Sequence, residues 1–155
     1  VTMLTQNVDG FHTAAGSRDV IEMHGNFQRI RCLGCRRRFT VRDYGELGPG
    51  RGVPACEACG AVLRPEVVLF GEALPLDAVG RLQAVLARGV DLVVSVGTTS
   101  VFPYIAGPVF DAAARGIPTV EVNPGTTQVS SLVDVRVIHG AAEALDLAYR
   151  AMRAG

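Results

Sequence analysis

The chain has 155 residues and a formal net charge of zero, with 15 basic against 15 acidic side chains. Hydrophobic residues make up 48% of the sequence and charged residues 19%, which excludes a disordered chain and favours a globular one. Because its apolar runs are too short to span a bilayer, no charged leader opens it and its charge is balanced, we expect a cytoplasmic protein without a membrane or nucleic-acid partner.

The first 31 residues begin with an apolar segment, residues 1–5, that has the character of the end of a buried strand. A buried strand needs neighbours on both edges, so we expect further sequence upstream of it. A polar loop follows over residues 6–17. We then predict a short helix over residues 19–23 and a strand over residues 27–31.

Residues 32–62 differ from the rest because they are rich in Cys, Gly, Pro and Arg and poor in aliphatic side chains. A segment of this composition cannot hold a core of its own, and something other than burial must stabilise it. We therefore predict a separate small module here, inserted into a domain made of residues 1–31 and 63–155.

The remainder of the chain alternates strands with helices. The predicted strands span residues 67–70, 91–96, 120–122 and 134–138. The predicted helices span residues 76–88, 103–115 and 141–152, and Gly116 fits the cap of the second helix. Strands that alternate with helices predict an α/β fold with a doubly wound parallel sheet.

All four cysteines lie in the small module, as two C-x2-C pairs separated by 20 residues. Two residues between thiols allow a tight turn to place both sulfurs on one tetrahedral ion, and four thiolates are typical of a structural zinc site. Two disulfides or four unpaired thiols are the alternatives. We predict one structural Zn²⁺, held by Cys32, Cys35, Cys56 and Cys59.

A cluster of arginines surrounds this module, at positions Arg29, Arg31, Arg36, Arg37 and Arg38. Such a cluster can form a nucleic-acid patch. In a chain of zero net charge, a solvated face on a small insert is the simpler interpretation, and binding of an acidic partner stays open.

Polar residues follow the first predicted strand, at the edge where ligands bind in open α/β sheets. Amide and carboxylate groups there can read ribose hydroxyls or a carboxamide, although such loops more often serve turns. The residues concerned are Gln6, Asn7 and Asp9. Further along, His24 is either a satisfied core histidine or a general base, whereas His12 and His139 have the character of loop or surface residues.

Taken together, these motifs resemble the sirtuin (Sir2) family over the entire chain. They are TQNVDGFHTAAGS, EMHGN, the two C-x2-C pairs, LRPEVVLFGEALP, VGTTS and VEVNP, in that order. The resemblance implies a Rossmann-like doubly wound sheet, N-terminally incomplete, with the zinc module inserted. It also implies an NAD-dependent protein-lysine deacetylase or deacylase that acts on acylated-lysine proteins or peptides.

The resemblance assigns roles to single residues. His24 matches the catalytic histidine, which acts as general base on a ribose hydroxyl after the acyl oxygen has displaced nicotinamide, and O-acyl-ADP-ribose is the product. The implied NAD contacts are Gln6, Asn7, Asp9, Gly97, Thr98, Thr99, Asn123, Pro124, Gly125 and Ala142. The implied contacts with the acylated peptide are Val68, Phe70, Gly71 and Glu72, and a buried strand with a turn is the plainer interpretation of that segment.

The sequence departs from the family pattern at Leu69, where most relatives have Trp or another aromatic residue, and at residues 101–105, which replace a V-x-P-A-A motif. The family's glycine-rich phosphate loop does not occur in it, so we expect this segment alone to be nearly inactive and the full-length protein to be the enzyme. Two other functions stay open. One is a zinc module that binds a partner without catalysis, and the other is an NAD hydrolase or ADP-ribosyltransferase of the same family.

Overall fold

The computed structural model describes residues 1–48 and 52–154. The chain forms two compact units, Val1–Val85 and Leu86–Gly155, and each is described here by itself. The predicted division into a module of residues 32–62 and a domain of residues 1–31 and 63–155 stays a prediction, and residues 49–51 of that module lie outside the described residues.

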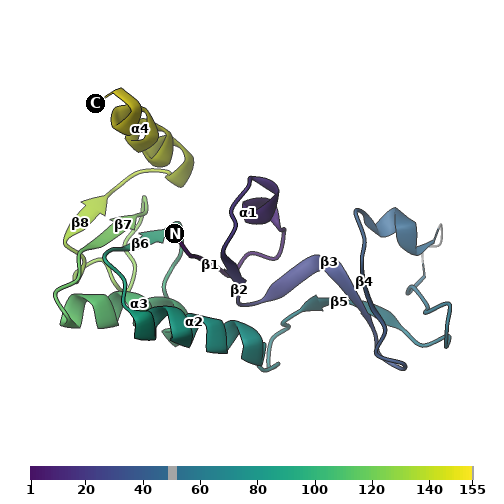
Figure 1. Cartoon of the computed structure of the whole chain (residues 1–155). Coiled ribbons are helices and arrows are strands. Elements are labelled where there is room, and N and C mark those ends of the chain that lie inside the picture. Colours follow the sequence, from purple (N-terminus) through teal and green to yellow (C-terminus); the bar gives the residue numbers. More distant parts are fainter. Residues whose placement is uncertain (49–51, 155) are drawn as a thin grey trace. The chain divides into compact units, whose positions relative to one another are not determined.

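The first unit opens with two short parallel strands, β1 (Met3–Thr5) and β2 (Val20–Glu22), as Figure 1 shows. A short helix, α1 (Phe11–Ala14), lies in the polar loop between them. The prediction of a helix over residues 19–23 is therefore wrong. Val20 and Ile21 are β-branched, and the segment pairs in register with β1, a contact that local periodicity does not reveal.

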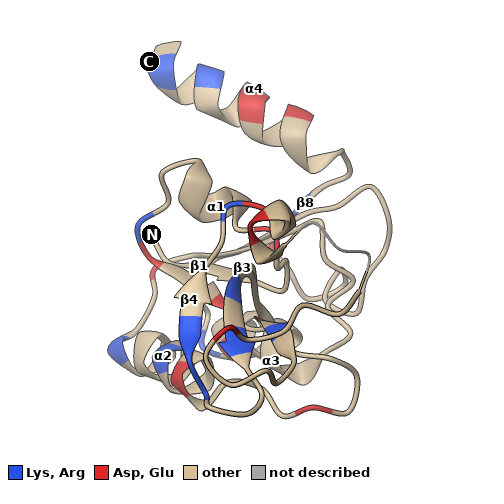
Figure 2. Cartoon of the chain, turned by 90° about the vertical axis from the view of Figure 1, so that its right-hand side faces the viewer, with Lys and Arg blue, Asp and Glu red and all other residues tan. Residues whose placement is uncertain are grey.

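The second sheet of this unit is antiparallel, with the strand order β4-β3-β5. Its strands are β3 (Gly25–Cys32), β4 (Arg38–Thr40) and β5 (Leu63–Val67), and a 3-10 helix, η1 (Tyr44–Leu47), follows β4. A small core packs beneath it, made of Ile30, Cys32, Val41, Cys56 and Leu63. Two cysteines thus belong to the core, and Figure 2 shows basic segments on β3 and β4.

The strand predicted over residues 67–70 lies instead at Leu63–Val67, so that prediction is correct only at Val67. Pairing with β3 ends at Gly25 opposite Val67, after which the chain turns, with the Glu72 N–H donating to the Leu69 carbonyl over 3.0 Å. Pro65 is tolerated within β5 because this is an edge strand of its sheet.

The second unit contains a parallel sheet with the order β6-β7-β8, formed by β6 (Val93–Val96), β7 (Thr119–Val122) and β8 (Val135–Val137). Helix α2 (Leu76–Arg88) belongs mostly to the first unit and precedes β6 in the chain. Within the second unit, α3 (Pro103–Ala114) connects β6 to β7, and α4 (Ala141–Ala154) follows β8. The predicted alternation of helices with parallel strands is confirmed. Gly116 follows α3 with φ +67°, as expected of a residue that ends a helix in the left-handed conformation.

Helix α3 packs on the sheet of the second unit through Ala106 and Val109, which form a core with Val129. The loop after β7 thus contributes a fully buried valine to this core. Among the helices that the structure describes, none is long and apolar enough to cross a membrane.

Candidate functional site

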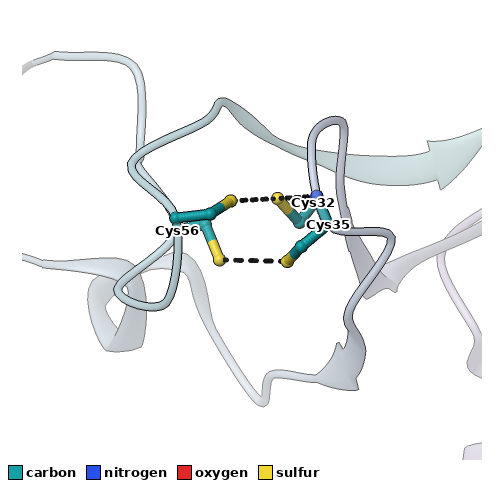
Figure 3. Close-up of side chains that lie close together, drawn as sticks. Cys32, Cys35 and Cys56 are labelled. Carbon is teal, nitrogen blue, oxygen red and sulfur yellow. Dashed lines mark hydrogen bonds between the residues drawn. The ribbon is translucent and has the colours of Figure 1, made fainter.

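The four cysteine sulfurs lie within 4.8 Å of one another, as the sequence predicts (Figure 3). The Sγ atoms of Cys32 and Cys59 are 3.4 Å apart, and those of Cys35 and Cys56 are 3.8 Å apart. Both separations are too long for a disulfide, whose S–S bond is about 2.05 Å. Zn–S bonds of about 2.3 Å place tetrahedral sulfurs roughly 3.8 Å apart. The geometry therefore fits one Zn²⁺ held by four thiolates.

The first cysteine pair is already arranged for a negative sulfur. The N–H groups of Gly34 and Cys35 point at the Cys32 Sγ over 3.3 Å and 3.4 Å. Burial opposes ionisation of Cys32, but these N–H groups and the Cys59 thiol outweigh it and lower the pKa of Cys32 to about 6. The backbone thus stabilises the thiolate of Cys32. In Cys35 the Arg37 N–H acts in the same direction, but the Cys32 and Cys59 thiols outweigh it and raise the pKa of Cys35 to about 11.

His24 lies just beyond the end of β2, and its ring is held by the polar loop after β1. Its Nδ1 is 3.1 Å from the backbone carbonyl oxygen of Gln6. A carbonyl can only accept a hydrogen bond, so Nδ1 carries the proton of the neutral ring and Nε2 is the acceptor. This is the tautomer that a general base working through Nε2 requires.

The segment after β5 is tied to the same histidine through the backbone. The Val68 N–H donates to the His24 carbonyl over 2.9 Å. Next to it, Gly25 has φ +80°, and a Cβ there would lie 1.9 Å from the Glu66 carbonyl oxygen. Only glycine permits this approach of β5 to the chain that carries His24. The first unit therefore brings together Gln6, His24 and Val68, for which the family resemblance predicts roles in NAD binding, catalysis and substrate binding.

The other polar residues of the loop after β1 make local hydrogen bonds. The Asn7 N–H donates to the Thr5 Oγ1 over 3.1 Å, and the Phe11 N–H donates to the Asp9 Oδ1 over 2.9 Å. The second bond places the Asp9 carboxylate at the start of α1. Turn chemistry is thus present in the loop, and the Asn7 side chain is exposed. NAD contacts by Asn7 and Asp9 stay predictions.

The turn after β5 is held by Glu72. Its carboxylate accepts two hydrogen bonds from Arg64, of 2.7 Å and 3.0 Å, and one from the Leu69 N–H of 3.0 Å. The Arg64 guanidinium and the Leu69 N–H lower the pKa of Glu72 to about 2. Gly71 has φ +83°, and the Phe70 side chain is fully exposed. Sequence reasoning missed Arg64, whose partner Glu72 lies eight residues away across a turn.

The second unit gathers four of the predicted NAD contacts, Gly97, Thr98, Asn123 and Gly125, at the ends of β6 and β7. The Asn123 Nδ2 donates to the Thr98 carbonyl over 2.9 Å, and the Gly125 N–H donates to the Asn123 Oδ1 over 3.0 Å. Gly97 begins the first turn with φ +61°. The other predicted contacts of this unit are exposed, namely Thr99, Pro124 and Ala142.

A buried carboxylate supports the second of these turns. Glu121 is 1% exposed and accepts hydrogen bonds from the hydroxyl of Thr127, from the Ser130 Oγ (2.6 Å) and from the Arg136 Nε (3.1 Å). Burial opposes its ionisation, but the Ser130 and Thr127 hydroxyls, with Arg136, keep the pKa of Glu121 below its usual range. Sequence reasoning missed this network, because a single Glu within a strand gives no signal for it.

Comparison with known proteins places this arrangement in a family. The family model described as "Sir2 family" matches residues 1–103. "NAD-dependent protein deacylase 2" of Pseudomonas aeruginosa is 46% identical over 137 residues, which cover 87% of this chain and 53% of that protein. "NAD-dependent protein deacylase 1" of Archaeoglobus fulgidus is 36% identical over 151 residues, covering 97% and 60%. The chain belongs to the Sir2 family.

Solved structures agree with this assignment and confirm the predicted fold class. A structure described as a Sir2 homolog–NAD complex superposes with a TM-score of 0.88 at 35% identity, covering 99% of this chain and 58% of that one. Another, described as Sir2–p53 peptide–NAD⁺, gives a TM-score of 0.89 at 29% identity, covering 100% and 64%. The chain thus spans 53% to 60% of the length of the two curated relatives named above.

Proposed function

We propose that the protein is an NAD-dependent protein-lysine deacylase and that His24 is its general base. The observation that carries the proposal is the hydrogen bond between the His24 Nδ1 and the Gln6 carbonyl, in a chain that belongs to the Sir2 family. This bond leaves Nε2 as the basic atom of the neutral ring. The Val68 N–H on the His24 carbonyl supports the proposal, because it ties the predicted substrate segment to the base.

In the proposed reaction, the protein's own groups position the reactants and move one proton. When bound, NAD supplies a ribose carbon from which nicotinamide leaves and to which the acyl oxygen becomes attached. The His24 Nε2 removes a proton from a ribose hydroxyl, which makes that oxygen nucleophilic toward the acyl carbon. The bond from this carbon to the lysine nitrogen then breaks, the lysine leaves as a free amine, and one water is consumed to release the O-acyl product. The Gln6 carbonyl stabilises the imidazolium that results, because it accepts from Nδ1 in both protonation states.

We propose that NAD is held by backbone and small polar groups. The half-buried Gln6 and Asp9 are proposed to contact nicotinamide and ribose together with Asn7. Contacts after the later strands are proposed at Gly97, Thr98, Thr99, Asn123, Pro124, Gly125 and Ala142. The bond between Asn123 and the Thr98 carbonyl supports this set, since it fixes the spacing of the two turns that carry most of these residues.

We propose that an acylated-lysine peptide lies along the segment after β5. Val68, Phe70, Gly71 and Glu72 are its proposed contacts. Because β5 is an edge strand, an extended peptide can continue the sheet with main-chain hydrogen bonds. The Arg64–Glu72 pair keeps this turn in shape, and Phe70 presents a fully exposed aromatic ring for an acyl chain.

The zinc site has a separate, structural role in this proposal. The four cysteines would supply all four ligands of a Zn²⁺ and leave no position for a water, so the ion would not activate a nucleophile. Thiols kept for metal binding are typical of a reducing compartment, and we propose the cytoplasm as the site of action.

The test is turnover of an acetyl-lysine peptide by the protein as its gene encodes it, with products measured by mass spectrometry. We expect NAD-dependent release of nicotinamide and O-acetyl-ADP-ribose. In His24→Ala, we expect a rate lower by at least about a hundredfold with zinc content unchanged, as for loss of a general base. His139→Ala is the matched control, since this exposed histidine has no proposed role.

Other products would select other functions. Free ADP-ribose in place of the acylated product would identify an NAD hydrolase or ADP-ribosyltransferase. If His24→Ala and the unchanged protein turned over the peptide equally, His24 would not be the base. Binding of a protein partner without any NAD consumption would identify a non-enzymatic zinc module.

A further inference from the structure

Three arginines lie side by side across the β4-β3-β5 sheet. In the strand register, Arg31 of β3 is opposite Arg38 of β4 on one side and opposite Arg64 of β5 on the other. Like charges that face one another on neighbouring strands destabilise a sheet. This arginine row therefore needs negative charge close to it.

The two outer arginines of the row, Arg38 and Arg64, each have a carboxylate close by. The Arg38 Nε is 2.7 Å from the Glu66 Oε1, and the Arg64 guanidinium binds both oxygens of Glu72. Each of these carboxylates thus forms an ion pair with an outer member of the row. Arg29 also approaches Glu66, at 3.9 Å, and the buried Glu66 Oε1 makes no hydrogen bond.

The central arginine has only the more distant charge of Glu72, which already binds Arg64. The Arg31 Nε is buried and has no hydrogen-bond acceptor, and Arg31 forms no ion pair within the part of the chain that the structure describes. A buried charged donor without an acceptor costs more than an exposed one. Folding alone does not explain an arginine here, because an apolar or neutral residue would avoid both this cost and the repulsion.

A cavity of about 850 Å³ in the first unit opens beside the arginine row. Arg31 and Arg38 line it, and so do Val68 and Glu72, two of the proposed peptide contacts. Figure 2 shows basic segments on β3 and β4, the strands to which Arg31 and Arg38 belong. A ligand in this cavity can therefore touch Arg31 and the peptide segment at the same time.

We propose that Arg31 binds the carboxylate of an acidic side chain that flanks the acyl-lysine, so that the protein prefers substrates with Asp or Glu beside the modified residue. The inference rests on the proposed function, whose substrate class it narrows. A guanidinium matches a carboxylate through paired hydrogen bonds, which gives geometric selection as well as charge. A free anion such as phosphate offers the same chemistry, and the test separates the two sources.

The test is fluorescence anisotropy with labelled acetyl-lysine peptides of one sequence, in which the flanking residues are Glu, Gln or Lys. We expect the Glu peptides to bind at least about tenfold more tightly than the Gln peptides, the range of a charge-assisted hydrogen bond. Arg31→Gln removes this preference. Arg37→Gln, which deletes an exposed arginine of the same module, keeps it. Equal binding of Glu and Gln peptides, or an unchanged preference in Arg31→Gln, would overturn the proposal.

Two further measurements fix the interpretation. The first is the thermal midpoint of Arg31→Gln without peptide. It should equal or exceed that of the unchanged protein, because the substitution removes the repulsion within the arginine row. A fall of several degrees would show that Arg31 has a structural partner. Inorganic phosphate is the second probe. If it raises the midpoint through Arg31 while the peptides show no preference, the site takes a free anion and the proposal is wrong.

Binding needs no turnover, so the two proposals fail separately. Deacylation without a preference for acidic peptides removes only the role of Arg31. A preference that depends on Arg31, in a protein that releases no nicotinamide, removes only the enzymatic function.

Discussion

The cysteine module of the first unit and the 123–130 loop of the second unit both hold irregular backbone, but they do so with different chemistry. In the module, four sulfurs within 4.8 Å of one another form the anchor, and two of these cysteines belong to the small core. In the loop, one buried carboxylate, Glu121, binds two hydroxyls from the loop and an arginine from β8. Neither region has enough aliphatic side chains to hold its shape by burial alone.

The comparison shows that the kind of group that holds a region determines two things. It determines whether the region can be predicted from the sequence, and how the region loses stability when that group is removed. Metal ligands come in a spacing that the ion dictates, and losing one ligand removes the whole ion. A carboxylate anchor has no fixed spacing, and losing it removes hydrogen bonds one at a time. The module should therefore unfold as a whole when one ligand is lost, whereas the loop should lose stability in smaller steps.

The largest effect is expected for Cys56→Ser. This variant should lose the ion and unfold the module, because structural zinc contributes on the order of 10 kcal/mol to folding. Metal content by mass spectrometry and near-ultraviolet circular dichroism would check this. Glu57→Gln, at the exposed neighbouring position, should keep one zinc per chain. A Cys56→Ser protein that retained one zinc would break the comparison.

A smaller but still large effect is expected for Gly25→Ala, which tests how the module joins the chain that carries His24. The new Cβ would meet the Glu66 carbonyl at 1.9 Å, so we expect a loss of about 4 kcal/mol or more in urea unfolding. Gly80→Ala is the control. It lies in α2 with open space around it, and should stabilise by up to about 1 kcal/mol. Equal stability of the two variants would show that β5 does not pack tightly there.

The smallest effect is expected for Glu121→Gln, and it depends on pH. Because the folded pKa of Glu121 lies below its usual value, the stability that this carboxylate adds is complete at neutral pH and is lost as the pH falls below about 5. Glu121→Gln should cost about 2 kcal/mol at pH 7 and show a flatter loss in acid. Thermal unfolding across this range would measure it, with Glu143→Gln as an exposed control. Parallel curves for Glu121→Gln and the unchanged protein would contradict the role of this carboxylate.

Local signals made much of the fold predictable. The helix predicted over residues 76–88 has those bounds in the structure, because its apolar spacing repeats over several turns. The segment over residues 19–23 was predicted incorrectly, because a strand of three residues has no periodicity and owes its form to β1. The strand predicted over residues 67–70 was misplaced because the pairing that ends it involves Gly25, far away in sequence.

In the candidate site, too, the features with a local sequence signal could be predicted, and those that depend on contacts distant in sequence could not. Cysteine spacing is local, so the metal ligands could be predicted and their geometry agrees. The motif around His24 indicated a base, but the tautomer depends on a carbonyl 18 residues away. Arg31 was interpreted as part of a solvated face, because only the strand register places it between Arg38 and Arg64.

The central claim is that the Gln6 carbonyl holds the proton of His24 on Nδ1. Nitrogen-15 NMR of the imidazoles at alkaline pH, where the rings are neutral, reports the tautomer directly, and His24→Ala assigns the signal. We predict a His24 ring protonated at Nδ1, with Nε2 as the basic nitrogen. A neutral His24 protonated at Nε2 would contradict the account, because that ring could not accept a proton at the proposed atom.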